Sequence, residues 1–211
     1  MKYFLCLLVG YMLGTINPSY IIAKLKGFDI REKGSLNAGA SNAVILLGKS
    51  VGFVCAIFDI AKPCIAIAIT RMMFPEFKLA LALTGFAAIL GHILPFYMGF
   101  KGGKGLACLG GVILTFNWKV FLIMLLCEVV IAFVTNYICF VPMTASVAWP
   151  FIYGLITKDI LGAGCFAIVA TVILIRHTEN IKRIACGKEA HLSFLWDRKR
   201  ELQRLGSTEE K

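Results

Sequence analysis

The chain alternates between long apolar runs and short polar breaks almost from end to end. About 20 apolar residues are enough to cross a lipid bilayer as an α-helix, and hydrogen bonding within the segment favours helices inside lipid. The pattern predicts an all-α polytopic membrane protein with about seven transmembrane helices. The predicted spans cover roughly residues 2–23, 51–70, 79–97, 105–117, 120–138, 139–157 and 160–176.

Basic residues are distributed unequally between the two sides of these spans. With the N-terminus outside, most of the 22 lysines and arginines fall on one side, in the loop after the first span, the loop before the fourth span and the segment from Arg176 onward. Lysine and arginine favour the cytoplasmic side of a membrane protein. The sequence therefore predicts an N-terminus outside and a C-terminus inside. The net charge of +10 then reflects topology and attraction to membrane lipid, and no nucleic-acid partner is expected.

Three polar segments on the predicted cytoplasmic side are rich in glycine, asparagine, histidine or charge. They are "REKGSLNAGASNA" (31–43), "GFKGGKG" (99–105) and "RHTENIKRIACGKE" (176–189). The predicted fourth span, which follows the second segment, is much shorter than the length that crosses a bilayer. Its helix is therefore expected to begin partway into the bilayer, so that the glycine-rich segment is recessed and lines a cavity.

The glycine-rich segment has the composition of an anion site. Gly102 and Gly103 allow positive φ, which turns successive N–H groups toward one point. Gly105 opens the following helix, whose N-terminal N–H groups favour an anion, and Lys104 adds a full positive charge there. The segment does not match a Walker loop, which needs Ser or Thr at the position of Gly105. A basic interhelical turn that includes Lys101 is the alternative on these residues alone.

The first polar segment supplies hydroxyl and amide side chains together with glycines. Such groups and the backbone N–H groups between them suit an anion. The residues concerned are Ser35, Asn37, Gly39, Ser41 and Asn42. The alternative is a capped loop in which Ser41 or Asn42 is the N-cap of the second helix.

The third polar segment ends the last predicted span. His177 and Asn180 are three residues apart and therefore share one face of that helix, beside Arg176. His177 is a candidate general base, hydrogen-bond donor or structural cap.

Other polar features inside the spans have structural explanations. Asp59 and Lys62 lie three residues apart in the second span and are expected to pair, because a charge inside a membrane needs a partner. Asn17 and Pro18 are expected to bend the first helix. The eight cysteines show no CxxC spacing and lie mostly in apolar spans, which favours packing, so no metal site is predicted.

Together the three polar segments bring hydroxyls, amides, an imidazole and lysines to one face of the membrane. No Ser-His-Asp, Cys-His or carboxylate-rich metal pattern accompanies them. Such a site suits holding two phosphate-bearing molecules together and accelerating acyl or phosphoryl transfer by positioning and charge stabilisation. An organic-anion transporter is the alternative from another class, but no polar stripe runs through the outward half of the spans and no inverted repeat is evident.

Three stretches closely resemble, in order and spacing, the cytoplasmic motifs of the PlsY family of bacterial acyl-phosphate:glycerol-3-phosphate acyltransferases. They are "GSLNAGASNA", "GHILPFYMGFKGGKG" and "RHTENIKRIACGKE", and the resemblance covers about residues 1–190. It implies a multi-pass protein of the bacterial plasma membrane with its active site facing the cytoplasm. The implied reaction moves a fatty acyl group from acyl phosphate to the sn-1 hydroxyl of glycerol 3-phosphate. Lysophosphatidate and phosphate form, and no metal or other cofactor is required.

The resemblance also implies roles for individual residues. Ser35 and Lys104 are expected to hold phosphate as catalytic residues. His177 and Asn180 are the other two expected catalytic residues, and together with Ser41 they are expected to orient the acyl phosphate and stabilise the developing oxyanion. The expected substrate-binding residues are Asn37, Gly39, Ser41, Asn42, Lys101, Gly102, Gly103 and Gly105.

Two positions of the first motif are the chief departures from the family pattern. Milder ones are Ser41, where the family usually has threonine, and residues 136–139, where it usually has a basic residue followed by Tyr-Val-Ser. The first motif normally reads GSGN, with an arginine of the phosphate site eleven residues after its opening glycine, and here Leu36 and Ile45 occupy these positions. Loss of a charged phosphate contact costs about 1.5–3 kcal/mol. The alternative is therefore a divergent paralogue that uses another acceptor, or a catalytically weak or silent protein.

Residues 191–211 follow the predicted acyltransferase domain, residues 1–190, as a cytoplasmic tail. Leu195, Leu202 and Leu205, with Phe194 and Trp196 among basic residues, fit an amphipathic helix at the membrane surface. A disordered tail is the alternative.

Overall fold

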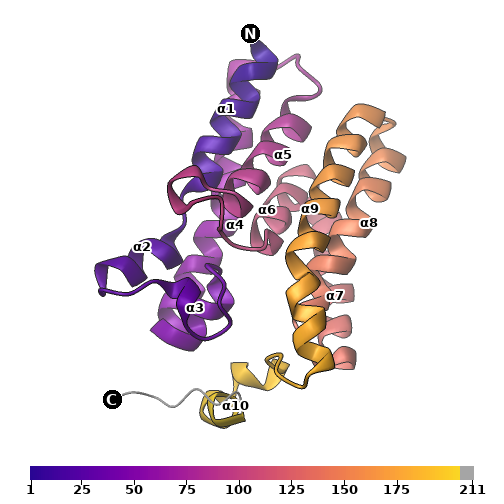
Figure 1. Ribbon diagram of the computed structural model, residues 1–211. Coiled ribbons are helices and arrows are strands. Elements are labelled where there is room, and N and C mark those ends of the chain that lie inside the picture. Colours follow the sequence, from indigo (N-terminus) through magenta and orange to yellow (C-terminus); the bar gives the residue numbers. More distant parts are fainter. Residues whose placement is uncertain (205–211) are drawn as a thin grey trace.

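The structure is a computed structural model that describes residues 1–204. Within this range the regular elements are helices and short 3₁₀ turns (Figure 1). The α-helices are α1 (Lys2–Thr15), α2 (Pro18–Leu25), α3 (Ala40–Leu47), α4 (Lys49–Met73), α5 (Ala80–Ile93), α6 (Leu106–Phe116), α7 (Trp118–Thr135), α8 (Phe140–Thr157), α9 (Ile160–Ala185) and α10 (Arg198–Arg204). The 3₁₀ turns are η1 (Ile30–Glu32), η2 (Phe96–Met98) and η3 (Leu192–Leu195).

The all-helical membrane fold predicted from the sequence is confirmed. Six segments of the described chain are long and apolar enough to cross a membrane, namely Lys2–Leu25, Lys49–Met73, Ala80–Met98, Trp118–Thr135, Phe140–Thr157 and Ile160–Ala185. The helix that follows the glycine-rich segment, α6, has 11 residues. A helix of that length spans only about half of a bilayer. The count of seven spans and the orientation with the N-terminus outside stay predictions.

The first span is interrupted where the sequence predicted a bend. α1 ends at Thr15 and α2 begins at Pro18, which has no N–H to continue the helix. The Asn17 side chain caps α2 by accepting a hydrogen bond from the Tyr20 N–H at 2.9 Å. The break leaves the Ile16 carbonyl without a helical partner, and a charged side chain from α4 binds it, as described below.

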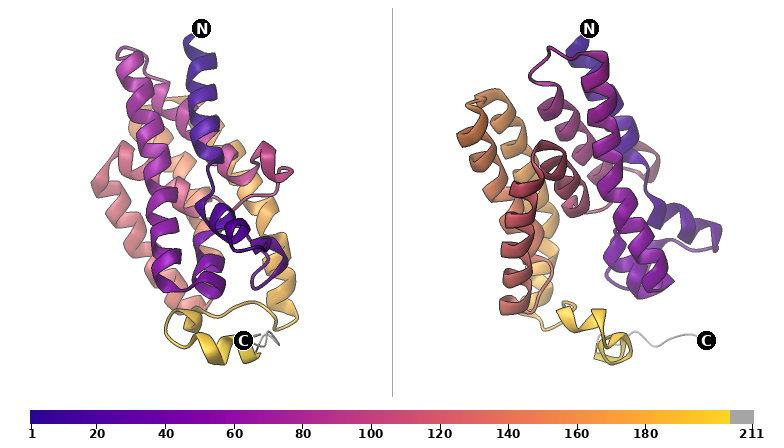
Figure 2. Two further views of the ribbon diagram at one scale, coloured as in Figure 1. Left: turned by 90° about the vertical axis from the view of Figure 1, so that its left-hand side faces the viewer. Right: turned by 180° about the vertical axis from the view of Figure 1, so that it is seen from behind.

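α1 lies closely against α5, and small residues make this approach possible. A Cβ atom on Gly14 would stand 2.2 Å from the Ala88 carbonyl oxygen, and one on Gly10 would stand 2.3 Å from that of Thr84. Small residues four apart on one helix are a common means of bringing two membrane helices into backbone contact. This pair, together with α4, forms one side of the molecule (Figures 1 and 2).

The other side of the molecule is formed by α7, α8 and α9, and α6 lies between the two groups (Figure 1). Aromatic rings fill the core where α6, α8 and α9 meet. Trp149 is fully buried, with its ring centroid 5.3 Å from that of Phe116 and 5.5 Å from that of Phe166. Many large apolar side chains on α7 are exposed, which fits a helix that faces lipid.

The tail contains η3 and α10, which lie beyond the end of α9 (Figures 1 and 2). Leu192 donates its N–H to the Asn136 carbonyl at 2.9 Å, which attaches the tail to the turn between α7 and α8. The amphipathic character of the tail stays a prediction, because Leu205 and the side chains of Phe194 and Leu202 lie outside the described part.

Candidate active site

A cavity of about 220 Å³ lies where the three polar segments meet. Residues of all three segments line it, which confirms the predicted convergence. Of the predicted site residues, those that line this inner cavity are Ser35, Asn37, Gly39, Ser41, Lys104, Gly105, His177 and Asn180. Lys101 and Gly102 line a neighbouring cavity, whereas Asn42 and Gly103 line neither. The glycine-rich segment lies at mid-height of the bundle, as the short α6 led us to expect (Figure 1).

The glycines pack the loop against the end of α5, and they do not form the predicted nest of N–H groups. The Gly102 N–H donates to the Ile93 carbonyl at 2.9 Å, and the Gly103 N–H donates to the His92 carbonyl at 3.1 Å. A Cβ atom on Gly103 would stand only 2.1 Å from His92 Nε2. Prediction of a phosphate nest from Gly102 and Gly103 was therefore wrong, because both N–H groups are used within the protein.

Positive φ occurs instead at Gly105, which has φ +91° and is the N-cap of α6. The first N–H groups of a helix have no intrahelical partner. Leu106 and Ala107 of this first turn line the inner cavity. The helix N-terminus therefore borders the cavity and favours an anion there.

Lys104 contacts Asn180 across the inner cavity. Its ammonium donates to Asn180 Oδ1, and Asn180 Nδ2 donates to Glu189 Oε1 at 2.6 Å. The second Glu189 oxygen accepts from Arg183 Nε at 2.7 Å. Burial, together with the charges of Arg183 and Arg176, lowers the pKa of Lys104 to about 8, while Glu189 opposes the shift. The lysine therefore stands in a positive field that an anion would relieve.

His177 is almost completely buried, with 1% of its surface exposed. Its Nδ1 lies 2.7 Å from the Ile173 carbonyl oxygen, one turn earlier on α9. A carbonyl oxygen only accepts hydrogen bonds, so Nδ1 must carry the proton. In the neutral imidazole, Nε2 is then an acceptor for a hydroxyl group in the cavity.

Asn42 organises the first polar segment from within. Its Nδ2 donates to the carbonyls of Ile30 and Asn37 at 2.7 and 2.9 Å, and its Oδ1 accepts from the Ser35 N–H at 2.9 Å. The side chain is fully buried. Its predicted contact with substrate stays a prediction, and the position explains how the loop is held.

The capping alternative for this segment is wrong. α3 has Gly39 as its N-cap, and Ser41 and Asn42 lie inside its first turn.

The structure also describes Leu36 and Ile45, the two first-motif positions that depart most from the family pattern. Leu36 has φ +58°, a backbone conformation that costs a residue with a Cβ about 1–2 kcal/mol. Ile45 lines the inner cavity and is 4% exposed.

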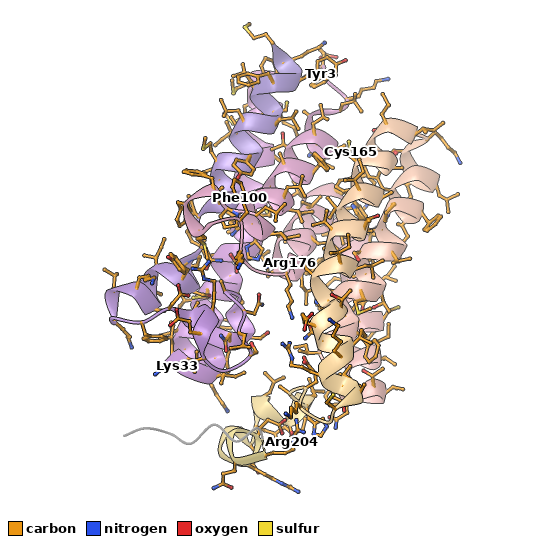
Figure 3. All side chains as sticks on the ribbon, viewed as in Figure 1. Tyr3, Lys33, Phe100, Cys165, Arg176 and Arg204 are labelled. Carbon is orange, nitrogen blue, oxygen red and sulfur yellow. The ribbon has the colours of Figure 1, made fainter. Side chains whose placement is uncertain are left out.

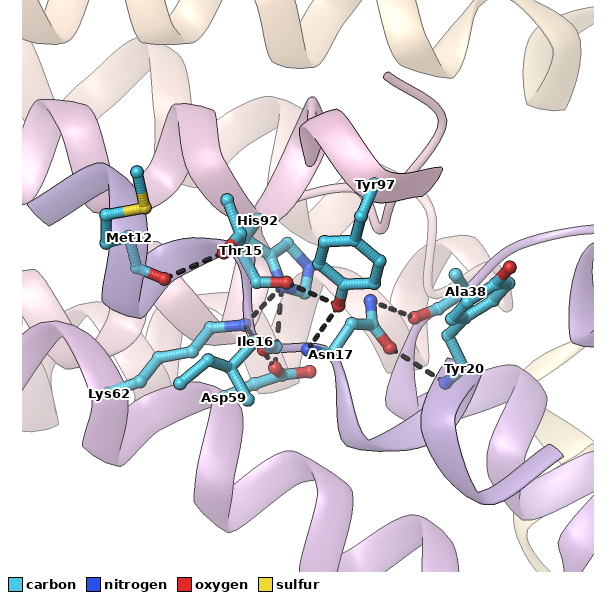
Figure 4. Close-up of polar contacts among 10 residues, drawn as sticks. All are labelled: Met12, Thr15, Ile16, Asn17, Tyr20, Ala38, Asp59, Lys62, His92 and Tyr97. Atoms are coloured by element: carbon cyan, nitrogen blue, oxygen red, sulfur yellow. Dashed lines mark hydrogen bonds and ion pairs between the residues drawn. The ribbon is translucent and has the colours of Figure 1, made fainter. Parts of the chain in front are cut away.

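A buried charged network lies beside the inner cavity (Figure 4). Lys62 Nζ donates to the Ile16 carbonyl and to Asp59 Oδ1, both at 2.7 Å, and lies 2.8 Å from His92 Nδ1. The predicted Asp59–Lys62 pair is thus confirmed. The ammonium of Lys62 also satisfies the carbonyl that the break after α1 set free. Asp59 and His92 line the cavity, and the His92 ring lies beneath Gly103.

Asn17 and Tyr97 extend this network to the first polar segment. The Tyr97 hydroxyl donates to the Thr15 carbonyl at 2.8 Å, and Asn17 Nδ2 donates to the Ala38 carbonyl at 2.8 Å (Figure 4). The network therefore connects α4 and the end of α5 to the loop that carries Ser35 and Gly39.

No role was assigned from the sequence to Glu189 or to His92. Both line the inner cavity. Glu189 belongs to the third segment, where it is one of two acidic residues among several basic ones, and its place in that segment was the available signal. Within residues 1–204, no group of three or more His, Cys, Asp or Glu residues is arranged to hold a metal ion.

Fold and site together define a class of protein. It is a multi-pass helical membrane protein with a cavity lined by the N-terminus of α6, a lysine, an imidazole and amides. Residues 4–187 match the family described as Glycerol-3-phosphate acyltransferase. The chain belongs to this family, which includes PlsY.

Similar proteins cover nearly the whole chain. Glycerol-3-phosphate acyltransferase 2 of Thermotoga maritima is 36% identical over 195 residues, which cover 92% of this chain and 98% of the relative. The glycerol-3-phosphate acyltransferase of Macrococcus caseolyticus is 38% identical over 198 residues, which cover 92% of this chain and 99% of the relative. The crystal structure of PlsY, an integral membrane glycerol 3-phosphate acyltransferase, in its glycerol 3-phosphate form has a TM-score of 0.83 and 32% identity. The structural match covers 92% of this chain and 98% of the PlsY chain.

Proposed function

We propose that this chain transfers a fatty acyl group from an acyl phosphate to the sn-1 hydroxyl of glycerol 3-phosphate. Lysophosphatidate and inorganic phosphate are the products, and the reaction begins phospholipid synthesis. The observation that carries the proposal is the meeting of Ser35, Lys104, His177 and Asn180 in one cavity of a membrane protein of this family. Crystal structures of PlsY in glycerol 3-phosphate and lysophosphatidic acid forms support the acceptor and the product.

Phosphate binding would rest on Lys104 and the N-terminus of α6. The ammonium and the free N–H groups of the first helical turn border the same cavity. Ser35 and Ser41 line it from the first polar segment. These groups would neutralise the leaving phosphate and hold the acyl carbonyl near the acceptor, which is catalysis by positioning and charge stabilisation.

His177 would orient the attacking hydroxyl through Nε2, since Nδ1 is fixed on the Ile173 carbonyl. The hydroxyl oxygen forms a bond to the acyl carbon, and the bond from that carbon to the phosphate oxygen breaks with its electron pair on phosphate. The proton of the hydroxyl passes to the leaving phosphate. Phosphate is a good leaving group, so no strong protein base is needed.

Cys139, the thiol that lines the cavity, does not suit a covalent route. Burial and the neighbouring Glu189 raise the pKa of Cys139 to about 11. The thiol is therefore protonated at neutral pH and a poor nucleophile. Direct transfer between the two substrates is the simpler mechanism.

Two apolar cavities adjoin the inner cavity and are suited to the acyl chain. One, of about 230 Å³, lies among α6, α7 and α8 and shares Leu106 and Ala107 with the inner cavity. The other, of about 690 Å³, lies along α3 and α4 and shares Ala40 and Ser41 with it. Either would let the donor keep its chain in an apolar environment while its phosphate reaches Lys104. The cytoplasmic face of a bacterial plasma membrane is the proposed location.

The proposal is tested with the purified full chain in detergent or bilayers, palmitoyl phosphate and glycerol 3-phosphate. Released phosphate and lysophosphatidate are expected in equal amounts, with both lost in Lys104→Ala and retained in the exposed control Lys78→Ala. No lysophosphatidate above the Lys104→Ala background would refute the proposed reaction.

Ile45 favours one second candidate, an acyltransferase for a different acceptor. The apolar side chain of Ile45 forms the part of the inner cavity wall where an arginine that binds phosphate was expected. The same assay with other polyol phosphates distinguishes the two. Faster phosphate release with one of these than with glycerol 3-phosphate would replace the first proposal with the second.

A further inference from the structure

A second cavity of about 780 Å³ adjoins the inner cavity and is larger than it. The two share Ser35, Asn37 and Lys104. The remaining walls of this outer cavity come from the region of η1, from the loop after η2 and from α9. A polar molecule in the outer cavity therefore lies next to the lysine that we place in the active site.

α9 contributes residues to both cavities. His177 and Asn180 line the inner cavity, whereas Arg176, Glu179 and Arg183 line the outer one. Consecutive residues of a helix point in different directions, and residues seven apart return to the same face. One stretch of α9 therefore carries the proposed catalytic groups on one face and two arginines on the adjacent face. Arg176 lies on α9 where the helix faces the other half of the molecule (Figure 3).

Four of the eight charged residues that line the outer cavity are in ion pairs, and Glu32 is a further acidic residue of its wall. Arg31 binds Asp29 at 2.8 Å, Arg183 binds Glu189 at 2.7 Å, and Glu179 binds Lys182 at 2.9 Å. Among residues 1–204, no carboxylate lies within 4.0 Å of the charged groups of Arg176 or Lys101. These two cations are therefore available to an anion.

Arg176 is the stronger of the two candidates. Its side chain is half-buried, so part of its hydration is lost without a carboxylate in return. A guanidinium presents a planar set of donors that matches two phosphate oxygens at once. An incoming phosphate group would supply the missing partner.

The wall that carries Lys101 is held rigidly. Arg31 Nη1 donates to the Met98 carbonyl at 2.6 Å and to the Lys101 carbonyl at 3.2 Å. The Arg31 guanidinium carbon also lies 5.0 Å from the centroid of the Tyr20 ring. Lys101 is exposed, and its backbone is fixed at the rim of the cavity opposite α9.

We propose that the outer cavity is a second anion subsite, in which Arg176, with Lys101 at the rim, binds a phosphate group on its way to or from the inner cavity. This inference rests on the proposed function. Each turnover consumes one soluble phosphate monoester, glycerol 3-phosphate, and releases one inorganic phosphate. Both are small dianions that need a polar route past Lys104, while the lipid donor approaches through an apolar one.

The test compares Arg176→Gln with Arg176→Lys and with the exposed control Arg71→Gln. Initial rates are measured with glycerol 3-phosphate and palmitoyl phosphate varied in turn, and with inorganic phosphate as inhibitor. In Arg176→Gln we expect the KM for glycerol 3-phosphate, the inhibition constant of inorganic phosphate, or both to rise about tenfold or more. The KM for palmitoyl phosphate is expected to stay within about twofold, with partial recovery in Arg176→Lys.

The pattern of effects identifies the anion. A rise in the KM for glycerol 3-phosphate alone assigns the subsite to the entering substrate, and a rise in the inhibition constant alone assigns it to the leaving phosphate. No rise in either constant overturns the inference. An equal rise in the KM for palmitoyl phosphate also overturns it, because the arginine would then act on the donor or on the whole site.

A binding measurement makes the inference independent of turnover. Calorimetric titration of the full-length wild-type protein with inorganic phosphate is compared with the same titration of Arg176→Gln and Lys101→Gln. We expect weaker binding in both variants, with the larger effect at Arg176. Unchanged binding in both would overturn the subsite even if the enzyme is active, and an inactive wild-type protein with Arg176-dependent phosphate binding would refute the proposed reaction alone.

Discussion

Replacing Lys62 with methionine removes one ammonium group from the membrane-embedded interior and keeps a side chain of similar length. Three contacts are lost together, to the Ile16 carbonyl, to Asp59 and to His92. Asp59 is 1% exposed and Lys62 is 2% exposed, so water does not replace the lost contacts. The variant therefore leaves a buried carboxylate with only the imidazole nearby.

The expected loss of stability follows from that uncompensated charge. Removal of one member of a buried ion pair costs about 3–5 kcal/mol. For a chain of this length each 1 kcal/mol lowers Tm by about 2–4 °C, so Lys62→Met is expected to lower Tm by about 6–20 °C. The double variant Asp59→Leu/Lys62→Met removes both charges and is expected to be no less stable than the single one, because the two sites share one interaction.

Thermal unfolding in detergent, followed by circular dichroism, measures this prediction, with the exposed Lys78→Met as the matched control. Enzymatic activity of the folded Lys62→Met protein is measured in parallel, because Lys62 contacts His92 and His92 packs against the glycine-rich loop. A Tm for Lys62→Met within about 2 °C of that of Lys78→Met would show that the network stabilises little, by less than about 1 kcal/mol. A double variant much less stable than the single one would refute the idea of one shared interaction.

Three further predictions concern the cavity. Lys104 has a pKa of about 8 and loses its charge above it, so kcat/KM for glycerol 3-phosphate is expected to fall about tenfold per pH unit above pH 8. Lys104→Arg is expected to move this decline beyond about pH 10, because arginine stays charged, and an unchanged profile would exclude the lysine as its cause. Gly103→Ala is expected to lose activity because its Cβ would stand 2.1 Å from His92 Nε2, whereas Gly164→Ala, with no atom within 4 Å, should match the wild-type rate. Ile45→Arg is expected to lower the KM for glycerol 3-phosphate about tenfold or more through a new charged contact, and an unchanged KM would show that this wall does not meet phosphate.

Hydropathy predicted the fold well because each long helix is an apolar run of bilayer length. The break at Pro18 and the pair of Asp59 and Lys62 were also predictable, since both follow from local rules about proline and buried charge. α2 and α3 were not predicted as separate helices. Each has only eight residues beside a polar segment, and their positions depend on contacts with α4 that no local pattern reveals.

The sequence predicted which segments meet at the site, and it did not predict how the glycines act. Gly102 and Gly103 suggested free N–H groups, but carbonyls at the end of α5 take both. That outcome depends on how closely the loop approaches His92, which is a tertiary distance. The meeting of the three segments was therefore predictable from residue types, whereas the direction of individual donors was not.

The orientation of Asn180 is fixed before any substrate arrives. A side-chain amide has a donating end and an accepting end, and the chain places an obligate partner at each. Glu189 only accepts hydrogen bonds, so Nδ2 must face it, and the ammonium of Lys104 only donates, so Oδ1 must face Lys104. One N–H of Nδ2 is left after the bond to Glu189, and in the proposed reaction it would donate to the developing oxyanion. Because the amide would need no reorientation, this donor would be preorganised by Glu189 and its partner Arg183.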